Sequence, residues 1–330
     1  MTGFELSKQK GLSMVELMIA ISLSLVLTLG VIQIFSSSKQ TSRVQNALAR
    51  LQENARFALD TLSYDIRMAG QLGCNSNAFI TDDTGKLRAF GNGIFGYEYS
   101  DSLTVALTTD TSDPNPDSND IIANTDAIIV MRASAKAIPA SSTSNTVSVS
   151  SADDIDDIDV GDPLVISDCE NADLFFAGTR SGSTIPISSS TTFSKTYPTN
   201  AELARLNYTA YYVRDDNGQK NLYRSYVNNG GISTEPLLEG VEDLQILYGE
   251  DKSNGNGNQI RYVDADQVTN MQNVTSVRIY LLLSTTENNL ATTPQNYWFK
   301  GNLQQAADGD RRLFRGFTTT IQLRNQGIGL

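Results

Sequence analysis

Residues 11–35, GLSMVELMIAISLSLVLTLGVIQIF, decide how the N-terminal part of this chain is organised. From Leu12 to Phe35 the chain runs for 24 residues in which Glu16 is the only charged side chain. A helix of about 20 apolar residues spans the hydrocarbon layer of a membrane, so this segment is long enough to cross it. Two lysines precede the run, and the positive-inside rule therefore predicts a single-pass anchor with its N-terminus in the cytoplasm.

Glu16 is the residue that a plain membrane anchor does not explain, because ionisable side chains inside membranes are costly and mark functional candidates. The stretch KGLSMVELMIAISL resembles the signal of type IV prepilins, in which a short charged leader ends in glycine and an apolar run carries glutamate at its fifth position. The resemblance implies that a prepilin peptidase cuts after Gly11 and methylates the new amine of Leu12. It also implies that Glu16 balances an N-terminal amine when helices bundle in a filament, since paired buried charges cost less than single ones.

A second apolar pattern follows the membrane segment. Between residues 36 and 69 apolar residues recur at steps of three and four, which predicts an amphipathic helix. No proline occurs between Leu12 and Gly70, and AGQLG at 69–73 supplies a glycine stop. We therefore predict one long helix whose second half packs under a β-sheet; the alternative is a membrane stalk followed by a separate helix. The apolar stripe consists of Val44, Leu48, Leu51, Ala55, Ala58, Leu62, Ile66 and Ala69.

The composition excludes several kinds of function. A net charge of −12 and a pI near 4.5 argue against a nucleic-acid-binding surface. The absence of histidine removes Ser-His-Asp and Cys-His catalysis and histidine-ligated zinc. No phosphate loop, dinucleotide fingerprint or hydrolase motif occurs, although nothing in the sequence rules out a carboxylate pair among so many acidic residues. We predict a protein without enzymatic activity and without a cofactor.

Beyond Gly73 the pattern changes to strands. Residues 103–109, 126–133, 162–168, 206–215, 276–285 and 312–325 are rich in branched and aromatic residues, and Asn217-Gly218 marks a hairpin turn. An early helix followed by such strands predicts an α+β fold with an antiparallel sheet. The Ser- and Thr-rich segments 139–151 and 181–194 are interpreted as exposed connections or edge strands.

The C-terminal stretches LLEGVEDLQILYGED, SVRIYLLLS and FTTTIQLRN, with both cysteine contexts, resemble the PilW group of minor pilins. The resemblance implies a type IV pilin-like fold with a leader at 1–11, a membrane or filament-core helix at 12–35, an amphipathic continuation at 36–72 and a periplasmic β-rich head at 73–330. It implies a role in initiating or assembling a type IV pilus of a Gram-negative bacterium. The implied partners are prepilin peptidase, other minor pilins, the major pilin, a tip adhesin and inner-membrane assembly proteins.

The two cysteines, Cys74 and Cys169, are the right number for one bridge in an oxidising compartment. Neither neighbourhood supplies the basic pocket of a reactive thiol, so we predict a disulfide that clamps the end of the long helix to the sheet. Its loop of roughly 100 residues would stabilise the fold by about 4 kcal/mol.

Two oxygen-rich loops are candidates for calcium. Asp251, Ser253, Asn256 and Asn258 could supply ligands in the loop at 249–259, but the same residue types occur in plain loops, which remains the favoured interpretation. The acidic stretch 151–163 is a weaker candidate because its spacing does not match a helix–loop–helix calcium site. Its carboxylates are Asp153, Asp154, Asp156, Asp157, Asp159 and Asp162.

Two other functions stay open at the level of sequence. A pseudopilin of type II secretion shares the leader, the helix and the sheet. An anchored periplasmic enzyme or binding protein would keep its leader, and neutralising Glu16 would leave its function unchanged.

Overall fold

The computed structural model describes residues 11, 13–73, 78–80, 93–98, 122–188, 190–228, 231–253 and 259–325. The chain divides into two compact units, Met1–Arg50 and Leu51–Leu330, which we describe separately. The predicted strand at 103–109 lies outside the described residues.

The long N-terminal helix is confirmed. Helix α1 spans Met14–Met68 without interruption, 55 residues. It ends where the glycine stop was predicted, because Gly70 adopts a φ of +74°, a conformation that favours glycine. The N–H of Gly70 donates to the carbonyl of Met131 at 2.9 Å, so the end of the helix is tied to the sheet that follows.

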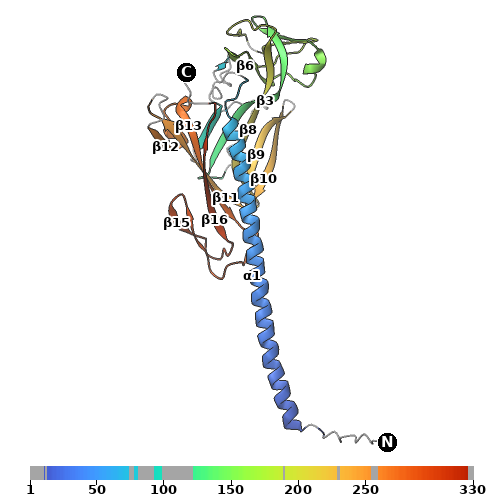
Figure 1. Cartoon of the computed structure of the whole chain (residues 1–330), viewed down its shortest axis with the longest axis vertical. Helices are drawn as coiled ribbons and strands as arrows, with labels where there is room; N and C mark the ends of the chain where they lie inside the picture. Colours follow the sequence, from blue (N-terminus) through green and yellow to red (C-terminus); the bar gives the residue numbers. More distant parts are fainter. Residues whose placement is uncertain are drawn as a thin grey trace, which may run out of the picture. The chain divides into compact units, whose positions relative to one another are not determined.

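The largest sheet of the described residues has ten strands (Figure 1). Its order is β1-β6-β5-β8-β3-β4-β7, with β2 on β3, β9 on β8 and β10 on β9. All of its pairs are antiparallel except the short parallel pair of β1 and β6. Its strands are β1 (Ala78–Ile80), β2 (Ile94–Glu98), β3 (Asp126–Ser142), β4 (Thr146–Val149), β5 (Pro163–Ser167), β6 (Ala172–Phe176), β7 (Thr184–Pro186), β8 (Ala201–Asp216), β9 (Gln219–Asn228) and β10 (Gly231–Glu239).

A second antiparallel sheet has the order β12-β11-β13-β16, and a separate hairpin joins β14 to β15. Its strands are β11 (Val241–Asp251), β12 (Ile260–Val263), β13 (Val274–Ser284) and β16 (Phe314–Gln322), and the hairpin pairs β14 (Asn296–Phe299) with β15 (Asn302–Gln305). Within the described residues three short 3-10 helices lie between strands: η2 (Ala152–Ile155), η3 (Ala265–Gln267) and η4 (Met271–Asn273). One helix and antiparallel sheets confirm the predicted α+β class.

The second half of α1 forms the centre of the main core. Six residues of the predicted stripe, from Leu51 to Ala69, are buried in one cluster with the inner faces of both larger sheets. Small residues at two helical positions, Ala55 and Ala58, let the strands approach the helix closely. The packing of this half of the helix on β-sheets therefore agrees with the prediction, and it follows from the period of three and four in the sequence.

Candidate functional site

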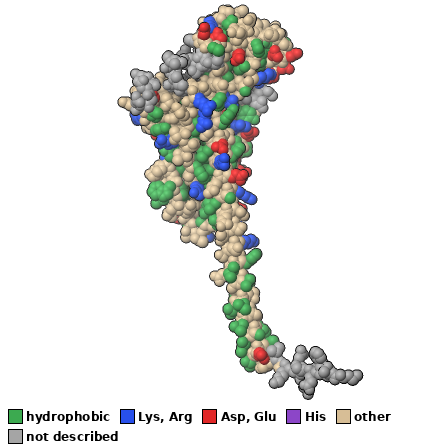
Figure 2. All heavy atoms as spheres, viewed as in Figure 1, with side chains coloured by type: hydrophobic (Ala, Val, Ile, Leu, Met, Phe, Trp, Pro, Cys, Tyr) green, Lys and Arg blue, Asp and Glu red, His purple; other side chains and the backbone are tan. Residues whose placement is uncertain are grey.

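The membrane-length part of α1 exposes apolar side chains at most of its positions, which cover all sides of a helix. Figure 2 shows them along the face in view. Helix α1 is the one helix of the described residues that is long and apolar enough to cross a membrane. A helix that is hydrophobic all round needs an apolar environment, which is either a protein core or a membrane. The exposed apolar side chains are Met14, Val15, Leu17, Met18, Ile19, Ile21, Leu23, Leu25, Val26, Leu27, Leu29, Val31, Ile32, Ile34 and Phe35.

The three hydroxyl side chains of Ser22, Ser24 and Thr28 are satisfied within the helix. The hydroxyls of Ser22, Ser24 and Thr28 donate to backbone carbonyls three or four residues earlier, at 2.8, 2.9 and 2.7 Å. Such bonds remove the cost of placing a hydroxyl in a medium without water. The segment can therefore sit in a membrane or against other apolar helices.

Glu16 is the only charged side chain between Leu12 and Phe35, and it lies in the first turn of α1. Its side chain is exposed, and its backbone N–H donates to the carbonyl of Ser13 at 3.1 Å. A carboxylate in the first turn interacts favourably with the positive end of the helix dipole. Gly11 is described and exposed, whereas Leu12 lies outside the described residues. The roles of Gly11, Leu12 and Glu16 in processing and assembly remain predictions.

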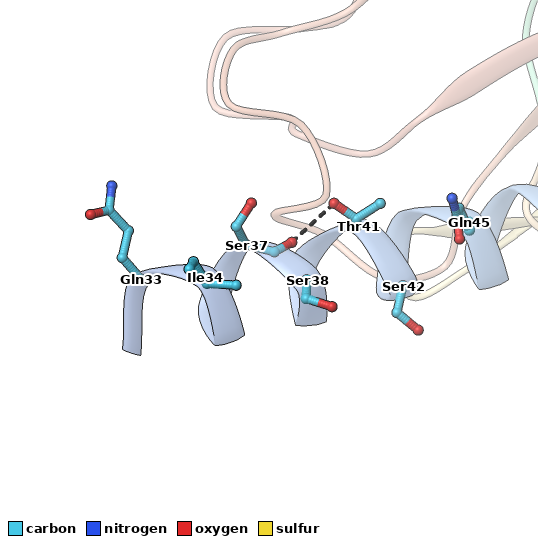
Figure 3. A pocket seen from close by; sticks show the side chains of 7 residues that line it. All are labelled: Gln33, Ile34, Ser37, Ser38, Thr41, Ser42 and Gln45. Atoms are coloured by element: carbon cyan, nitrogen blue, oxygen red, sulfur yellow. Dashed lines mark hydrogen bonds between the residues drawn. The ribbon is translucent and has the colours of Figure 1, made fainter. Parts of the chain in front are cut away.

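The surface of the helix changes character just past Phe35. Small polar side chains, with Ile34, line a shallow hollow along α1 (Figure 3). The hydroxyl of Thr41 donates to the carbonyl of Ser37 at 2.9 Å. The polar side chains of this hollow are Gln33, Ser37, Ser38, Thr41, Ser42 and Gln45. The all-round apolar surface thus ends close to residue 35.

The two larger sheets meet at a pair of carboxyl groups, one buried (Asp126) and one half-buried (Glu98), that the sequence did not reveal. Glu98 and Asp126 are direct cross-strand neighbours in β2 and β3. Asp126 accepts a hydrogen bond from the backbone N–H of Ile246 in β11 at 2.6 Å, and Glu98 accepts one from the N–H of Ala265 in η3 at 3.0 Å. The pair therefore joins strands of one sheet to elements of the other.

Burial and mutual repulsion decide how this pair ionises. Desolvation, followed by the charge of Glu98, raises the pKa of Asp126 to about 8. Desolvation also raises the pKa of Glu98. Lys300 offsets part of both shifts, and Tyr248 lies fully buried beside the pair, with its own pKa raised by desolvation and by these carboxyls. Asp126 is only 3% exposed, so we interpret the pair as a structural link rather than a catalytic one.

A second link joins the helix to the larger sheet. The hydroxyl of Tyr211 in β8 donates to the carboxylate of Asp65 in α1. Arg132 in β3 pairs with the same carboxylate at 3.6 Å. Burial, followed by the charge of Asp65, raises the pKa of Tyr211 above its ordinary value, so this phenol stays a donor. These contacts fix the rotation of the second half of α1 on the sheet.

The chain on both sides of Cys74 lies beside the chain on both sides of Cys169. A Cβ atom built on Gly73 would collide with the hydroxyl of Ser167. On the other side Ala78 is paired in register with Ala172. Cys169 is described and is not a free thiol. Cys74 lies outside the described residues, so the disulfide between the two stays a prediction, which this placement supports.

The calcium candidates are only partly described. In the loop at 249–259 the carboxylate of Asp251 accepts hydrogen bonds from the N–H and the hydroxyl of Ser253, at 2.8 and 2.5 Å. Asn256 and Asn258 lie outside the described residues. No group of three or more acidic or cysteine side chains is placed to hold a metal in the part of the chain that is described.

Two carboxylates of the acidic stretch form ion pairs with Arg205. Asp162 is buried, accepts from the N–H of Asp159 at 3.0 Å and pairs with Arg205 at 3.2 Å. Arg205 also lies 3.9 Å from Asp157. Desolvation raises the pKa of Asp162, and Arg205 opposes that rise.

Comparison with known proteins agrees with the resemblance found in the sequence. Residues 210–325 match the family model described as Type IV Pilus-assembly protein W, and residues 6–32 match the model of the prokaryotic N-terminal methylation motif. These matches confirm the resemblance of the C-terminal stretches to the PilW group and of the N-terminal stretch to a prepilin signal. No curated protein matches the chain.

Among solved structures, the chain is similar to a type IV-like pilin from Thermus thermophilus at 16% identity. The match covers 51% of this chain and 86% of that one, with a TM-score of 0.21. The two family models thus match a pilin-type signal at the start of the apolar helix and about the last third of the chain.

Proposed function

We propose that this chain is a minor pilin that takes part in the initiation and assembly of a type IV pilus. The observation that carries the proposal is the combination of two matches at opposite ends of the chain, the methylation motif at 6–32 and the PilW model at 210–325. The first covers the start of α1, which is exposed, apolar and carries one carboxylate. The second covers strands that pack around the later part of the same helix, from Leu51 to Ala69. A pilin of this kind has a structural role rather than an enzymatic one.

In this proposal the chain begins as a single-pass protein of the inner membrane. The N-terminus lies in the cytoplasm and the head in the periplasm, as the lysines before the apolar run imply. Prepilin peptidase then cuts between Gly11 and Leu12 and methylates the new amine. The described α1 begins at Met14, three residues after Gly11, which is compatible with this step.

Assembly then follows from the surface of the helix. Moving the helix out of the lipid requires little free energy when the apolar side chains of residues 14–35 pack against the helices of other pilins. Glu16 would be costly in such a bundle unless it met a positive charge, and the amine of Leu12 on the same or a neighbouring subunit provides one. The partners would be other minor pilins and the major pilin, with a tip adhesin and inner-membrane assembly proteins.

The proposal is tested by comparing Glu16→Gln with Glu53→Gln. Both changes remove one carboxylate from α1, but Glu53 lies in the part of the helix that belongs to the head. We expect Glu16→Gln to reduce the number of surface pili about tenfold or more, and Glu53→Gln to leave it unchanged. Equal pilus numbers in both strains would contradict the proposal. A Glu16→Gln strain that assembles pili but fails to secrete enzymes would instead indicate a pseudopilin of type II secretion.

A further inference from the structure

Strand β16 is the terminal strand of its sheet, and one row of its backbone groups faces away from β13. The N–H of Leu323 donates to Thr275 and the N–H of Thr285 donates to Leu313, both at 2.9 Å. With the register of the two strands, this places the odd-numbered residues of β16 in hydrogen bonds to β13. The N–H and C=O groups of Thr318, Thr320 and Gln322 therefore point outward.

The outward row is engaged at both ends and open between them, because beyond Gln322 the N–H of Arg324 donates to the carbonyl of Arg67 in α1 at 3.4 Å. Gln295 caps Phe314 at the start of β16, because its side chain accepts from the N–H of Phe314 at 2.7 Å and donates to its carbonyl at 3.2 Å. Within the described residues no hydrogen bond reaches the outward backbone groups of Thr318, Thr320 or Gln322. All three residues are exposed, so the row is accessible to another chain.

The edge also lacks the backbone devices, proline and bulges, that keep many strand edges from pairing. Proline, bulges and inward charges normally protect long edges. The other long edge, β10, has such devices, namely Pro236 and a register shift between Pro236 and Leu238. β16 pairs with β13 over nine residues without a shift and contains no proline. It is thus a regular edge, and an edge of this kind is a site of aggregation unless another chain covers it.

The charge around this edge indicates what kind of chain would pair with it. Residues 311–325 contain four arginines and no acidic residue, in a chain whose net charge is −12. Arg312 is engaged by Asp310 at 2.7 Å and by Glu242 at 2.5 Å. Arg311, Arg315 and Arg324 are exposed. An extended segment with acidic side chains near its ends would be attracted by these arginines.

The same arginines argue against a second copy of this chain as the occupant. Two copies paired antiparallel through β16 would bring together two segments that each carry four arginines and no acidic residue. Such an accumulation of like charge disfavours the pairing. A symmetric dimer through β16 would therefore be opposed by its own charges.

We propose that the outer edge of β16 binds an extended, acidic segment of another polypeptide by adding it as a further strand. Recognition would come from the backbone groups of Thr318, Thr320 and Gln322, and selectivity for acidic segments from Arg315 and Arg324. This inference does not depend on the role of the chain in a pilus, because it rests only on the head.

The experiment uses the full-length protein in detergent and two labelled peptides. Both have nine residues with alternating threonine and valine, and they carry aspartate or lysine at their ends. Binding is measured by fluorescence anisotropy at low salt. We expect the acidic peptide to bind at least about tenfold more tightly than the basic one.

Three variants locate the binding. Thr320→Pro removes an outward N–H without removing a bond to β13, and it should abolish binding. Arg315→Glu combined with Arg324→Glu should reverse the preference between the peptides. Arg261→Glu makes the same substitution once, at an exposed position of β12, the opposite edge of the same sheet, and should leave the preference between the peptides unchanged.

Hydrogen exchange of the unmodified protein provides a readout that does not depend on a variant's folding. On adding the acidic peptide, the amides of Thr318, Thr320 and Gln322 should gain protection. No binding, equal binding of both peptides, or protection elsewhere would overturn the proposal. So would a dimer of the full chain that Thr320→Pro dissociates, because a second copy would then be the occupant.

Discussion

Replacing Asp126 with asparagine should make the stability of the head less dependent on pH. Burial raises the pKa of Asp126 in the folded protein to about 8, from an ordinary value of 3.8. A carboxyl group with a raised pKa contributes stability that is fully present below the ordinary value and is lost as the pH rises through the folded value. The wild-type head should therefore lose stability between about pH 4 and about pH 8.

The size of the effect follows from the same two values. Their difference corresponds to roughly 6 kcal/mol when the group passes from fully protonated to fully ionised. Asparagine has nearly the same shape and keeps an oxygen that can accept from the N–H of Ile246. The variant should therefore match the wild type near pH 4 and exceed it in stability by several kcal/mol near pH 8.

The assay is urea unfolding of the full-length protein in detergent across this pH range, with Asp154→Asn as the control. Asp154 is an exposed carboxylate in η2, so its variant should follow the wild-type curve. Glu98→Gln should also flatten the curve, because the charge of Glu98 is one cause of the raised pKa of Asp126. If the curves of Asp126→Asn and the wild type run parallel at all pH values, Asp126 ionises freely and the reasoning fails.

Three further predictions concern the head. Replacing Leu62, which is 0% exposed in the core, with alanine should lower the free energy of unfolding by about 2–5 kcal/mol. The control is Phe57→Ala, at a position 51% exposed on the same helix, which should lower the free energy of unfolding by less than about 1 kcal/mol. If urea unfolding gave equal losses for the two variants, the packing of α1 would be contradicted. Cys169→Ser should lower stability by about 4 kcal/mol if Cys74 and Cys169 are bridged, with no thiol detectable in the unfolded wild type; two titratable thiols would refute the bridge. Millimolar calcium should leave the melting temperature unchanged, because Asp251 already bonds Ser253, whereas a clear rise would favour the site with Asn256 and Asn258.

The long helix and the strands could be predicted because local patterns determine them. The stripe from Leu51 to Ala69 has the helical period, and the core buries each of its residues in this range. Strands β3, β5, β8, β13 and β16 fall where branched and aromatic residues cluster. The turn at Asn217-Gly218 joins β8 to β9, with positive φ at both residues, as an Asn-Gly turn requires.

Length and lateral position of strands were harder to predict. β3 continues through an alanine-rich stretch to Ser142, past a register shift between Ala133 and Ala137. Within the serine-rich segments, β7 is an edge strand as expected, but β4 lies between β3 and β7 and buries Val147. Alternating small polar residues give little signal of burial, because the decisive neighbours are distant in the sequence.

The carboxyl pair could not be predicted, since Glu98 and Asp126 meet only through the register of β2 on β3. Their burial further depends on β11, which arrives more than a hundred residues later. The basic edge is different. The four arginines between 311 and 325 are visible in the sequence, and only their placement on an unpaired strand required the structure.

The central claim is that this chain is processed and assembled as a pilin, and mass spectrometry of the N-terminal peptide tests it most directly. The protein is isolated from its native membrane and digested without prior labelling of amines. The account predicts a peptide that begins at a methylated Leu12. An intact peptide bond between Gly11 and Leu12 would contradict it and would leave an anchored periplasmic domain with an unexplained Glu16.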